Sequence, residues 1–188
     1  MPPADALPIA NRRYGRLKTC ATVLHASALW VAWLAVGKPA LSAYAGGVSQ
    51  TVFRHTHRVT YAECTVGNHV YYGRYLDLLE AARCKFFRQL GHPLAQLQEA
   101  DTIFPVIEAR LRYKAAARYD DVLVIEIVVA EISKVRLTFA CRILHESGRL
   151  LVEATTVHVC ASTADRPKRL PDDLCAALAP YLAPPGSE

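Results

Sequence analysis

The stretch ECTVGNHVYYGRYLDLLEAAR, residues 63–83, joins a short polar run to the start of an amphipathic helix. Apolar side chains recur every three or four residues, which predicts a helix over about residues 73–90. The apolar stripe consists of Tyr75, Leu79, Ala82, Phe86 and Leu90, widened by Leu76, Leu78 and Phe87. So wide a stripe predicts a mostly buried helix. Gly91 and Pro93 follow at the positions where a helix usually ends.

Strand-like patterns lie on both sides of this helix. Before it, residues 52–63 alternate β-branched or aromatic side chains with polar ones. After it, runs rich in Val, Ile, Leu, Thr and Phe cover residues 103–117, 122–132, 135–146 and 149–162. Short links at 120–121, 133–134 and 147–148 predict that consecutive strands pair antiparallel. With a short C-terminal helix from about Pro171, this order predicts an α+β fold, a long helix packed on one sheet face.

Composition limits the function classes. Hydrophobic residues make up 52% of the 188 residues and charged residues 21%, which fits one ordinary domain with a real core. The net charge is +5, but residues 1–50 hold five Lys or Arg against one aspartate. The rest of the chain is therefore nearly neutral, which argues against nucleic-acid binding. The six cysteines form no C-x-x-C pair, so we expect buried thiols in a reducing compartment and no metal site.

Residues 1–50 form a basic and apolar extension ahead of a domain predicted over residues 51–188. A basic patch at 11–18 precedes an apolar run at 20–36, which is short for a membrane span of roughly 20 residues. Three interpretations remain open: a signal or single anchor, an extra amphipathic helix lying on the body or a membrane, and a translation-start artefact. Membrane contact is expected only through residues 20–36. The expected location is the cytoplasm, or a membrane-anchored or exported form if residues 12–45 are a targeting segment.

Taken together, these motifs resemble the hotdog-fold acyl-CoA thioesterases of the 4-hydroxybenzoyl-CoA thioesterase type. The resemblance is carried by the run from Tyr61 to Leu76 with Glu80, Ala82 and Arg83, and by Tyr113-Lys114, residues 117–121, 137–139 and 166–171. It implies a hotdog fold, a long central helix wrapped by a curved antiparallel sheet of about five strands. It also implies a homodimer with sheets joined edge to edge, or a dimer of such dimers, with active sites between subunits. The implied activity is hydrolysis of an acyl-CoA thioester to free acid and CoA, without metal or another cofactor.

Two positions depart from the family pattern. Thr65 stands where the family usually has the carboxylate that acts as nucleophile or general base, and Asn68 stands where it usually has glycine. A threonine hydroxyl is far too weak an acid to replace that carboxylate unaided. We therefore expect Glu80 or His69 to activate water, with Thr65 and Asn68 positioning it.

The substrate-binding residues are expected on both sides of these groups. The backbone amides from Val70 to Tyr72 at the helix start would polarise the thioester carbonyl. Tyr71 and Tyr72 would line the acyl pocket, and Glu63 would share a strand face with Thr65 if the strand continued that far. The CoA phosphates require cations, for which the candidates are Arg118, Lys134, Arg136, Arg166, Lys168 and Arg169. Of these we select Arg118 and the clustered Arg166, Lys168 and Arg169, the last three being preferred.

Each assignment has a structural alternative. Glu80 would form an ion pair with Arg83, Asn68 would be a turn residue in the left-handed region, and His69 would satisfy loop backbone groups. The alternative function is a catalytically impaired hotdog protein that binds acyl thioesters or serves as an assembly partner. A dehydratase of the same fold has no supporting pattern beyond the fold itself.

Overall fold

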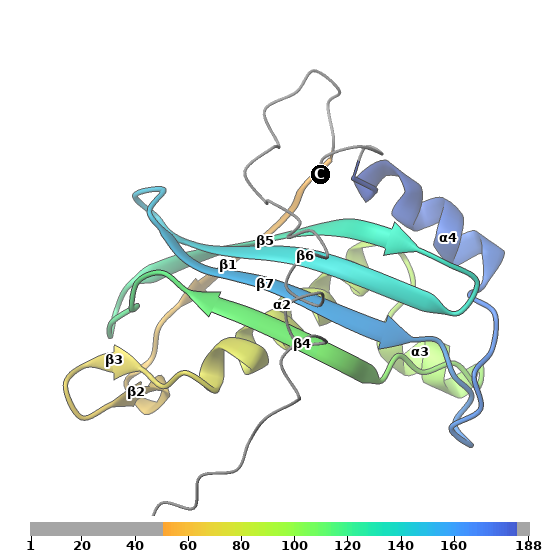
Figure 1. Cartoon of the computed structure of the whole chain (residues 1–188), viewed down its shortest axis with the longest axis horizontal. Helices are drawn as coiled ribbons and strands as arrows, with labels where there is room; N and C mark the ends of the chain where they lie inside the picture. The colour runs from red at the N-terminus through yellow and green to blue at the C-terminus, as the bar shows by residue number, and fades with distance from the viewer. Residues whose placement is uncertain (1–50, 184–188) are drawn as a thin grey trace, which may run out of the picture. The chain divides into compact units, whose positions relative to one another are not determined.

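The computed structural model describes residues 51–183 (Figure 1). The three interpretations of the N-terminal extension concern residues outside this range. Five strands form one antiparallel sheet in the order β1-β5-β6-β7-β4. Their bounds are Phe53–Arg58 for β1, Val106–Tyr113 for β4, Val122–Ile132 for β5, Arg136–His145 for β6 and Leu150–Val159 for β7. The predicted antiparallel sheet of about five strands is confirmed.

The long helix α2, Arg74–Gln89, lies against one face of this sheet, as the apolar stripe predicted. It is not mostly buried, however: half of its 16 residues are exposed, among them Leu76 at 45%. Phe86 and Phe87 are fully buried, and each places its ring 6.2 Å from the ring of Phe139 on β6. Gly91, with φ at +80°, takes the left-handed conformation that ends the helix. The C-terminal helix α4, Asp172–Leu178, buries Leu174 and Leu178 and begins where it was predicted.

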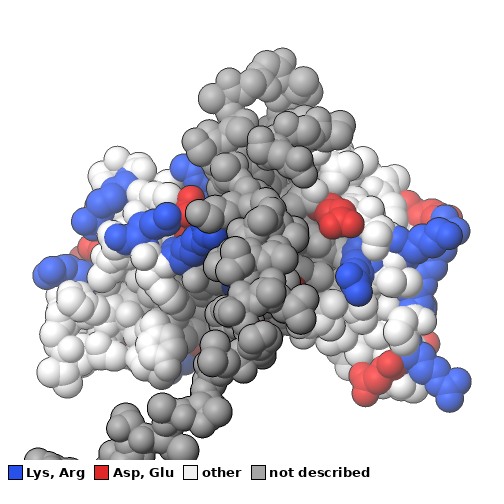
Figure 2. All heavy atoms as spheres, viewed as in Figure 1, with Lys and Arg blue, Asp and Glu red and all other residues white. Residues whose placement is uncertain are grey.

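The outer face of the sheet carries a row of alternating charges. Arg54, Glu126, Arg142, Glu153 and Arg112 are successive register partners across β1, β5, β6, β7 and β4. Glu126 accepts a 3.0 Å hydrogen bond from Arg54 and lies 3.7 Å from Arg142. Figure 2 shows this face, with Lys and Arg side chains next to carboxylates. Because a one-residue slip would move every charge to the other face, the row stabilises this register.

Two predictions about local structure were wrong, and one short helix was missed. The first strand ends at Arg58 rather than near residue 63, because the chain turns into a 3-10 helix, η2, at Tyr61–Glu63. A short helix, α3, at Leu94–Glu99 was not predicted. The strand β4 pairs with β7, whereas β5 pairs with β1, so the link at 120–121 does not join two neighbouring strands.

The segment between β4 and β5 crosses beneath the start of α2. Ala117 is fully buried, its amide donates to the Tyr75 hydroxyl at 3.1 Å, and its carbonyl accepts from the Val70 amide at 3.0 Å. The segment thereby connects β4, at one edge of the sheet, to β5, which lies next to β1 at the other edge. It leaves β4 as an edge strand beside the residues that precede α2.

Candidate active site

The polar run ahead of α2 folds into a small hairpin. The strand β2, Cys64–Thr65, pairs with β3, His69–Val70, and the register sets Thr65 opposite His69. The three-residue loop between them contains Gly67 at φ +97° and Asn68 at φ +59°. Both angles lie in the left-handed region, which glycine and asparagine adopt at least cost. These small and polar residue types are therefore required by the tight turn itself.

The side chains of Asn68 and Thr65 both hold the hairpin in place. The Asn68 Oδ1 atom accepts a 3.0 Å hydrogen bond from the amide of Tyr119, in the segment that follows β4. The Thr65 hydroxyl donates to the carbonyl of His69 at 3.1 Å. The alternative interpretation of Asn68 as a turn residue thus matches its placement.

The backbone amides around the start of α2 are not equivalent. The Val70 amide donates to the Ala117 carbonyl at 3.0 Å, and the Tyr71 amide donates to the Glu63 carbonyl at 2.9 Å. Among residues 51–183, the amides of Tyr72 and Gly73 have no acceptor. These two amides stand at the positive end of a 16-residue helix, where donors can stabilise a developing oxyanion.

Glu63 is turned away from the hairpin and toward β1. Its carboxylate accepts from the Nε2 atom of His57 at 2.9 and 3.1 Å, from the Thr60 amide at 2.6 Å and from the Thr60 hydroxyl at 2.8 Å. Burial acts to raise the pKa of Glu63, but the hydrogen bonds from Thr60 and His57 outweigh it and lower the pKa below its usual value. The strand does not continue to Thr65, so the expected shared face of Glu63 and Thr65 does not form.

Glu80 and His69 are both exposed, and neither side chain has a hydrogen-bond or ion-pair partner within residues 51–183. The alternative ion pair between Glu80 and Arg83 does not form, because the Arg83 side chain extends toward His158 on β7. Helix geometry separates the Cα atoms of Gly73 and Glu80 by about 10 Å along α2, so within one protomer Glu80 lies well away from the free amides. His69 stands next to the free amides in sequence, whereas Glu80 lies about two turns into the helix.

Arg83 and His158 form a polar contact inside the core. The Nδ1 atom of His158 lies 3.2 Å from the Phe104 carbonyl, which can only accept, so Nδ1 carries the proton. The Nε2 atom then accepts from Arg83 at 3.4 Å and from the Thr156 hydroxyl at 3.0 Å. Burial, together with the Arg83 charge, lowers the pKa of His158 to about 4, so the ring is neutral. The Nε atom of Arg83 is buried and has no partner among the described residues.

Three exposed tyrosines belong to the residues around the free amides or contact them. Tyr71 and Tyr72 are exposed, with ring centroids 4.5 Å apart. Tyr113, at the end of β4, donates from its hydroxyl to the Tyr72 carbonyl at 3.1 Å and packs 5.5 Å from the Tyr75 ring. The structure thus adds His57 and Tyr113 to the predicted set. The sequence predicted that both residues lie on strands. It did not reveal their contacts, because Tyr113 binds a residue far away in the chain.

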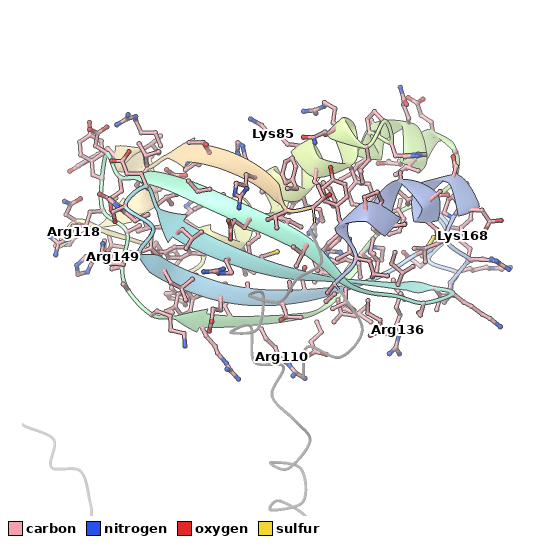
Figure 3. The ribbon with its side chains drawn as sticks, turned by 90° about the horizontal axis from the view of Figure 1, so that it is seen from above. Lys85, Arg110, Arg118, Arg136, Arg149 and Lys168 are labelled. Atoms are coloured by element: carbon pink, nitrogen blue, oxygen red, sulfur yellow. The ribbon has the colours of Figure 1, made fainter. Side chains whose placement is uncertain are left out.

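The predicted CoA-binding cations lie in two places. Figure 3 places Arg118 and Lys168 at opposite ends of the domain. Lys168 donates to the Asp101 carbonyl at 2.8 Å, and Arg169 lies 3.4 Å from Asp172. The side chains of Arg118 and Arg166 have no ion-pair partner in the part of the chain that the structure describes. One protomer therefore does not bring all four cations to a single phosphate group.

Residues 51–183 contain no group of three or more His, Cys, Asp or Glu side chains arranged to hold a metal ion. None of the helices in this range is both long and apolar enough to cross a membrane.

Comparisons with known proteins agree with this geometry. The acyl-CoA thioester hydrolase YbgC of Escherichia coli O6:H1 is 30% identical over 130 residues, covering 69% of this chain and 97% of the relative. The crystal structure of the hypothetical protein TT1821 from Thermus thermophilus is 34% identical, with a TM-score of 0.64 over 68% of this chain and 98% of that one. Slr0204, a 1,4-dihydroxy-2-naphthoyl-CoA thioesterase from Synechocystis, has a TM-score of 0.65 at 23% identity, covering 69% of this chain and 96% of that one.

These similarities confirm the predicted hotdog fold. The thioesterase-like superfamily model matches residues 59–178, from the end of β1 through α4, and so includes the hairpin, the free amides and the edge strand. With that match over more than half of its length, the chain belongs to the thioesterase-like superfamily.

Proposed function

We propose that this protein is an acyl-CoA thioesterase that hydrolyses an acyl-CoA thioester to the free acid and CoA. The observation that carries the proposal is the pair of free amides of Tyr72 and Gly73 at the start of α2. A thioester carbonyl placed there accepts two hydrogen bonds that strengthen as negative charge develops on its oxygen. The E. coli relative, named as an acyl-CoA thioester hydrolase, supports the same reaction.

The reaction needs a nucleophile and a base. A water oxygen attacks the carbonyl carbon while a base takes one of its protons, giving a tetrahedral oxyanion at the two amides. The C–S bond then breaks, and the CoA thiolate leaves and takes up a proton. His69 and Glu80 are the two candidate bases: His69 from the same protomer, and Glu80 from a second copy packed against the open edge. Protein groups alone supply these roles, so we propose that no metal or other cofactor takes part.

A second copy of the chain is proposed to complete the site. The Lys114 amide donates to the Leu151 carbonyl, so by alternation the amides of Ala109, Leu111 and Tyr113 point to the open edge of β4. This edge also exposes Val106, Ile107 and Tyr113 to 49%, 53% and 49%. An open edge with apolar side chains favours pairing with another strand. We infer a homodimer joined through β4, which a dimer of dimers would extend.

Antiparallel pairing of the two β4 strands would also bring cations from opposite ends of the two protomers close together. A two-fold axis at the middle of β4 sets one end of a protomer beside the opposite end of its partner. Arg118 of one copy and the 166–169 loop of the other would then flank the same entrance to the start of α2. We propose that the CoA phosphates bind between them, with the free side chains of Arg118 and Arg166 making the main contacts.

We further propose that the protein works in a reducing compartment, the cytoplasm. The five cysteines between residues 51 and 183 are all free. Burial raises the pKa of Cys141 to about 12, so this thiol is unreactive.

The test is thiol release from a panel of short aliphatic, long aliphatic and aromatic acyl-CoAs by the parent chain, His69→Gln and Glu80→Gln. We expect turnover by the parent and a loss of about 10²-fold or more in kcat for the variant that lacks the base. Arg142→Gln, on the outer sheet face, is the matched control and should keep parental kcat. Unchanged turnover in both His69→Gln and Glu80→Gln would exclude the two bases.

One observation favours the alternative function. Thr65 replaces the family carboxylate, and its hydroxyl is already used by the His69 carbonyl. If the parent binds acyl-CoA without releasing thiol, the chain is an acyl-thioester-binding protein or an assembly partner, and the enzyme assignment is wrong.

A further inference from the structure

Glu63 links three parts of the site at a single residue. Its carboxylate binds His57 on β1 and Thr60 ahead of η2, and its own carbonyl accepts from the Tyr71 amide at 2.9 Å. Glu63 ends η2 and directly precedes the hairpin, so the side chain holds the start of the hairpin while the carbonyl holds its end. No other residue in the described range joins β1 to the residue before Tyr72 in this way.

The carbonyl contact decides which amide stays free. The Val70 amide is taken by Ala117 and the Tyr71 amide by Glu63, and the first amide without an acceptor is that of Tyr72. If the Glu63 carbonyl moved, the Tyr71 amide would lose its acceptor and the turn into α2 would relax. The direction of the Tyr72 amide, on which the oxyanion contact depends, would then be held only by the 2.8 Å hydrogen bond that the Tyr71 carbonyl, in the same peptide plane, accepts from the Arg74 amide.

The carboxylate contacts are strong enough to hold that position. One oxygen of Glu63 accepts both the Thr60 amide at 2.6 Å and the Thr60 hydroxyl at 2.8 Å, and His57 approaches both oxygens. Only 18% of the Glu63 side chain and 25% of the His57 side chain are exposed. Hydrogen bonds to an ionised, half-buried group are stronger than those between neutral groups. These contacts involve both oxygens of the carboxylate and fix its position.

We propose that Glu63 is a positioning residue of the thioesterase site, held by His57 and Thr60 and acting through its carbonyl on the Tyr71–Tyr72 turn. This role rests on the proposed function and replaces the expected substrate contact of Glu63. Glu63 touches neither the substrate nor the water in this role. It sets the geometry of the oxyanion donors and thereby affects kcat more than KM.

The experiment uses the full chain with one acyl-CoA that the parent hydrolyses, and compares the parent with Glu63→Gln, His57→Gln and the double variant. Glu126→Gln is the matched control, since Glu126 is likewise a carboxylate held by side-chain partners and is 15% exposed, but lies on the outer sheet face. We expect kcat to fall at least tenfold in Glu63→Gln, with KM within a factor of two. The double variant should lose no more than Glu63→Gln alone, because His57 acts through Glu63.

Amide hydrogen exchange separates positioning from general loss of stability. In Glu63→Gln, exchange should become faster in residues 64–73 and stay parental in β5 to β7. Parental kcat in Glu63→Gln, or a loss of activity matched by faster exchange over the whole sheet, would overturn the proposal. A parent without turnover would instead reject the proposed function, and a pH–rate profile that loses its acidic limb only in Glu63→Gln would make Glu63 the base itself.

Discussion

The hydroxyl of Tyr113, the last residue of β4, donates a 3.1 Å hydrogen bond to the carbonyl of Tyr72, one residue before Gly73 and the start of α2. This contact ties the open sheet edge to the residue whose amide is free. A change at the edge can therefore reach the site through one hydrogen bond, without any contact to the substrate.

Replacing Tyr113 by phenylalanine tests this link. Tyr113→Phe keeps the ring contact with Tyr75 and removes only the hydroxyl, so we expect a stability loss of about 1 kcal/mol. Because the Tyr72 carbonyl loses its donor, we expect kcat to fall several-fold. Urea unfolding and steady-state kinetics measure the two effects, with Tyr119→Phe as the control. Parental kcat in Tyr113→Phe would show that the edge contact has no part in the reaction.

Proline at the open edge tests the proposed dimer. The Ala109 amide points away from β7, so Ala109→Pro removes no hydrogen bond inside the protomer but blocks pairing with a second β4 strand. We expect the parent to sediment as a dimer or a dimer of dimers and Ala109→Pro as a folded monomer with at least tenfold lower activity.

Ala109→Val, which keeps the amide, is the control and should stay parental in mass and activity. A dimeric and active Ala109→Pro variant would rule out assembly through β4.

The fold could be predicted from the sequence wherever local spacing determines it. The α2 stripe from Tyr75 to Leu90 and the alternation in β5 to β7 each follow from one element and the face it buries. The partner of β4 could not be predicted, because strand order depends on contacts between residues that lie far apart in the chain. The early end of β1 depends on the hydrogen bonds of Glu63 with Thr60, which alternation does not reveal.

In the candidate site, too, local sequence predicted the elements but not the contacts between distant residues. The hairpin and the helix start were predicted as the place of chemistry, and the structure brings Thr65, Asn68, His69 and Tyr72 together there. The turn role of Asn68 was one of the two interpretations of that residue, but the hydrogen-bond partners of these side chains were not predictable. Asn68 accepts a hydrogen bond from the Tyr119 amide, 51 residues away, and only this contact shows that its side chain joins the hairpin to the segment after β4.

Replacing Thr65 by aspartate tests whether the missing family carboxylate limits the rate of thioester hydrolysis. Thr65→Asp removes the hydroxyl that donates to the His69 carbonyl, which costs about 1 kcal/mol of stability. It also places a base at the family position, and a positioned general base contributes about 10²–10⁴-fold. We expect thiol release to rise at least tenfold above the parent. Thr65→Asn, similar in size but uncharged, is the control. An equal rise in both variants would attribute the gain to hairpin geometry and not to the base.

The buried His158 predicts how stability depends on pH. Its pKa is lowered from 6.5 to about 4 in the folded protein, by burial first and then by the charge of Arg83. The unfolded chain therefore binds a proton between these values that the folded chain does not. This contribution to the free energy of unfolding is fully present above pH 6.5 and is lost as the pH falls toward 4, at a slope of up to about 1.4 kcal/mol per pH unit.

Urea unfolding at pH 7, 6 and 5 measures this slope in the parent and in His158→Gln. Glutamine can still donate to the Phe104 carbonyl and accept from Arg83, but it takes up no proton. We expect the slope below pH 6.5 to become shallower in His158→Gln by nearly one proton. Equal slopes in the parent and His158→Gln would mean that the core admits a charged His158 beside Arg83, and the neutral tautomer assigned to the contact would be wrong.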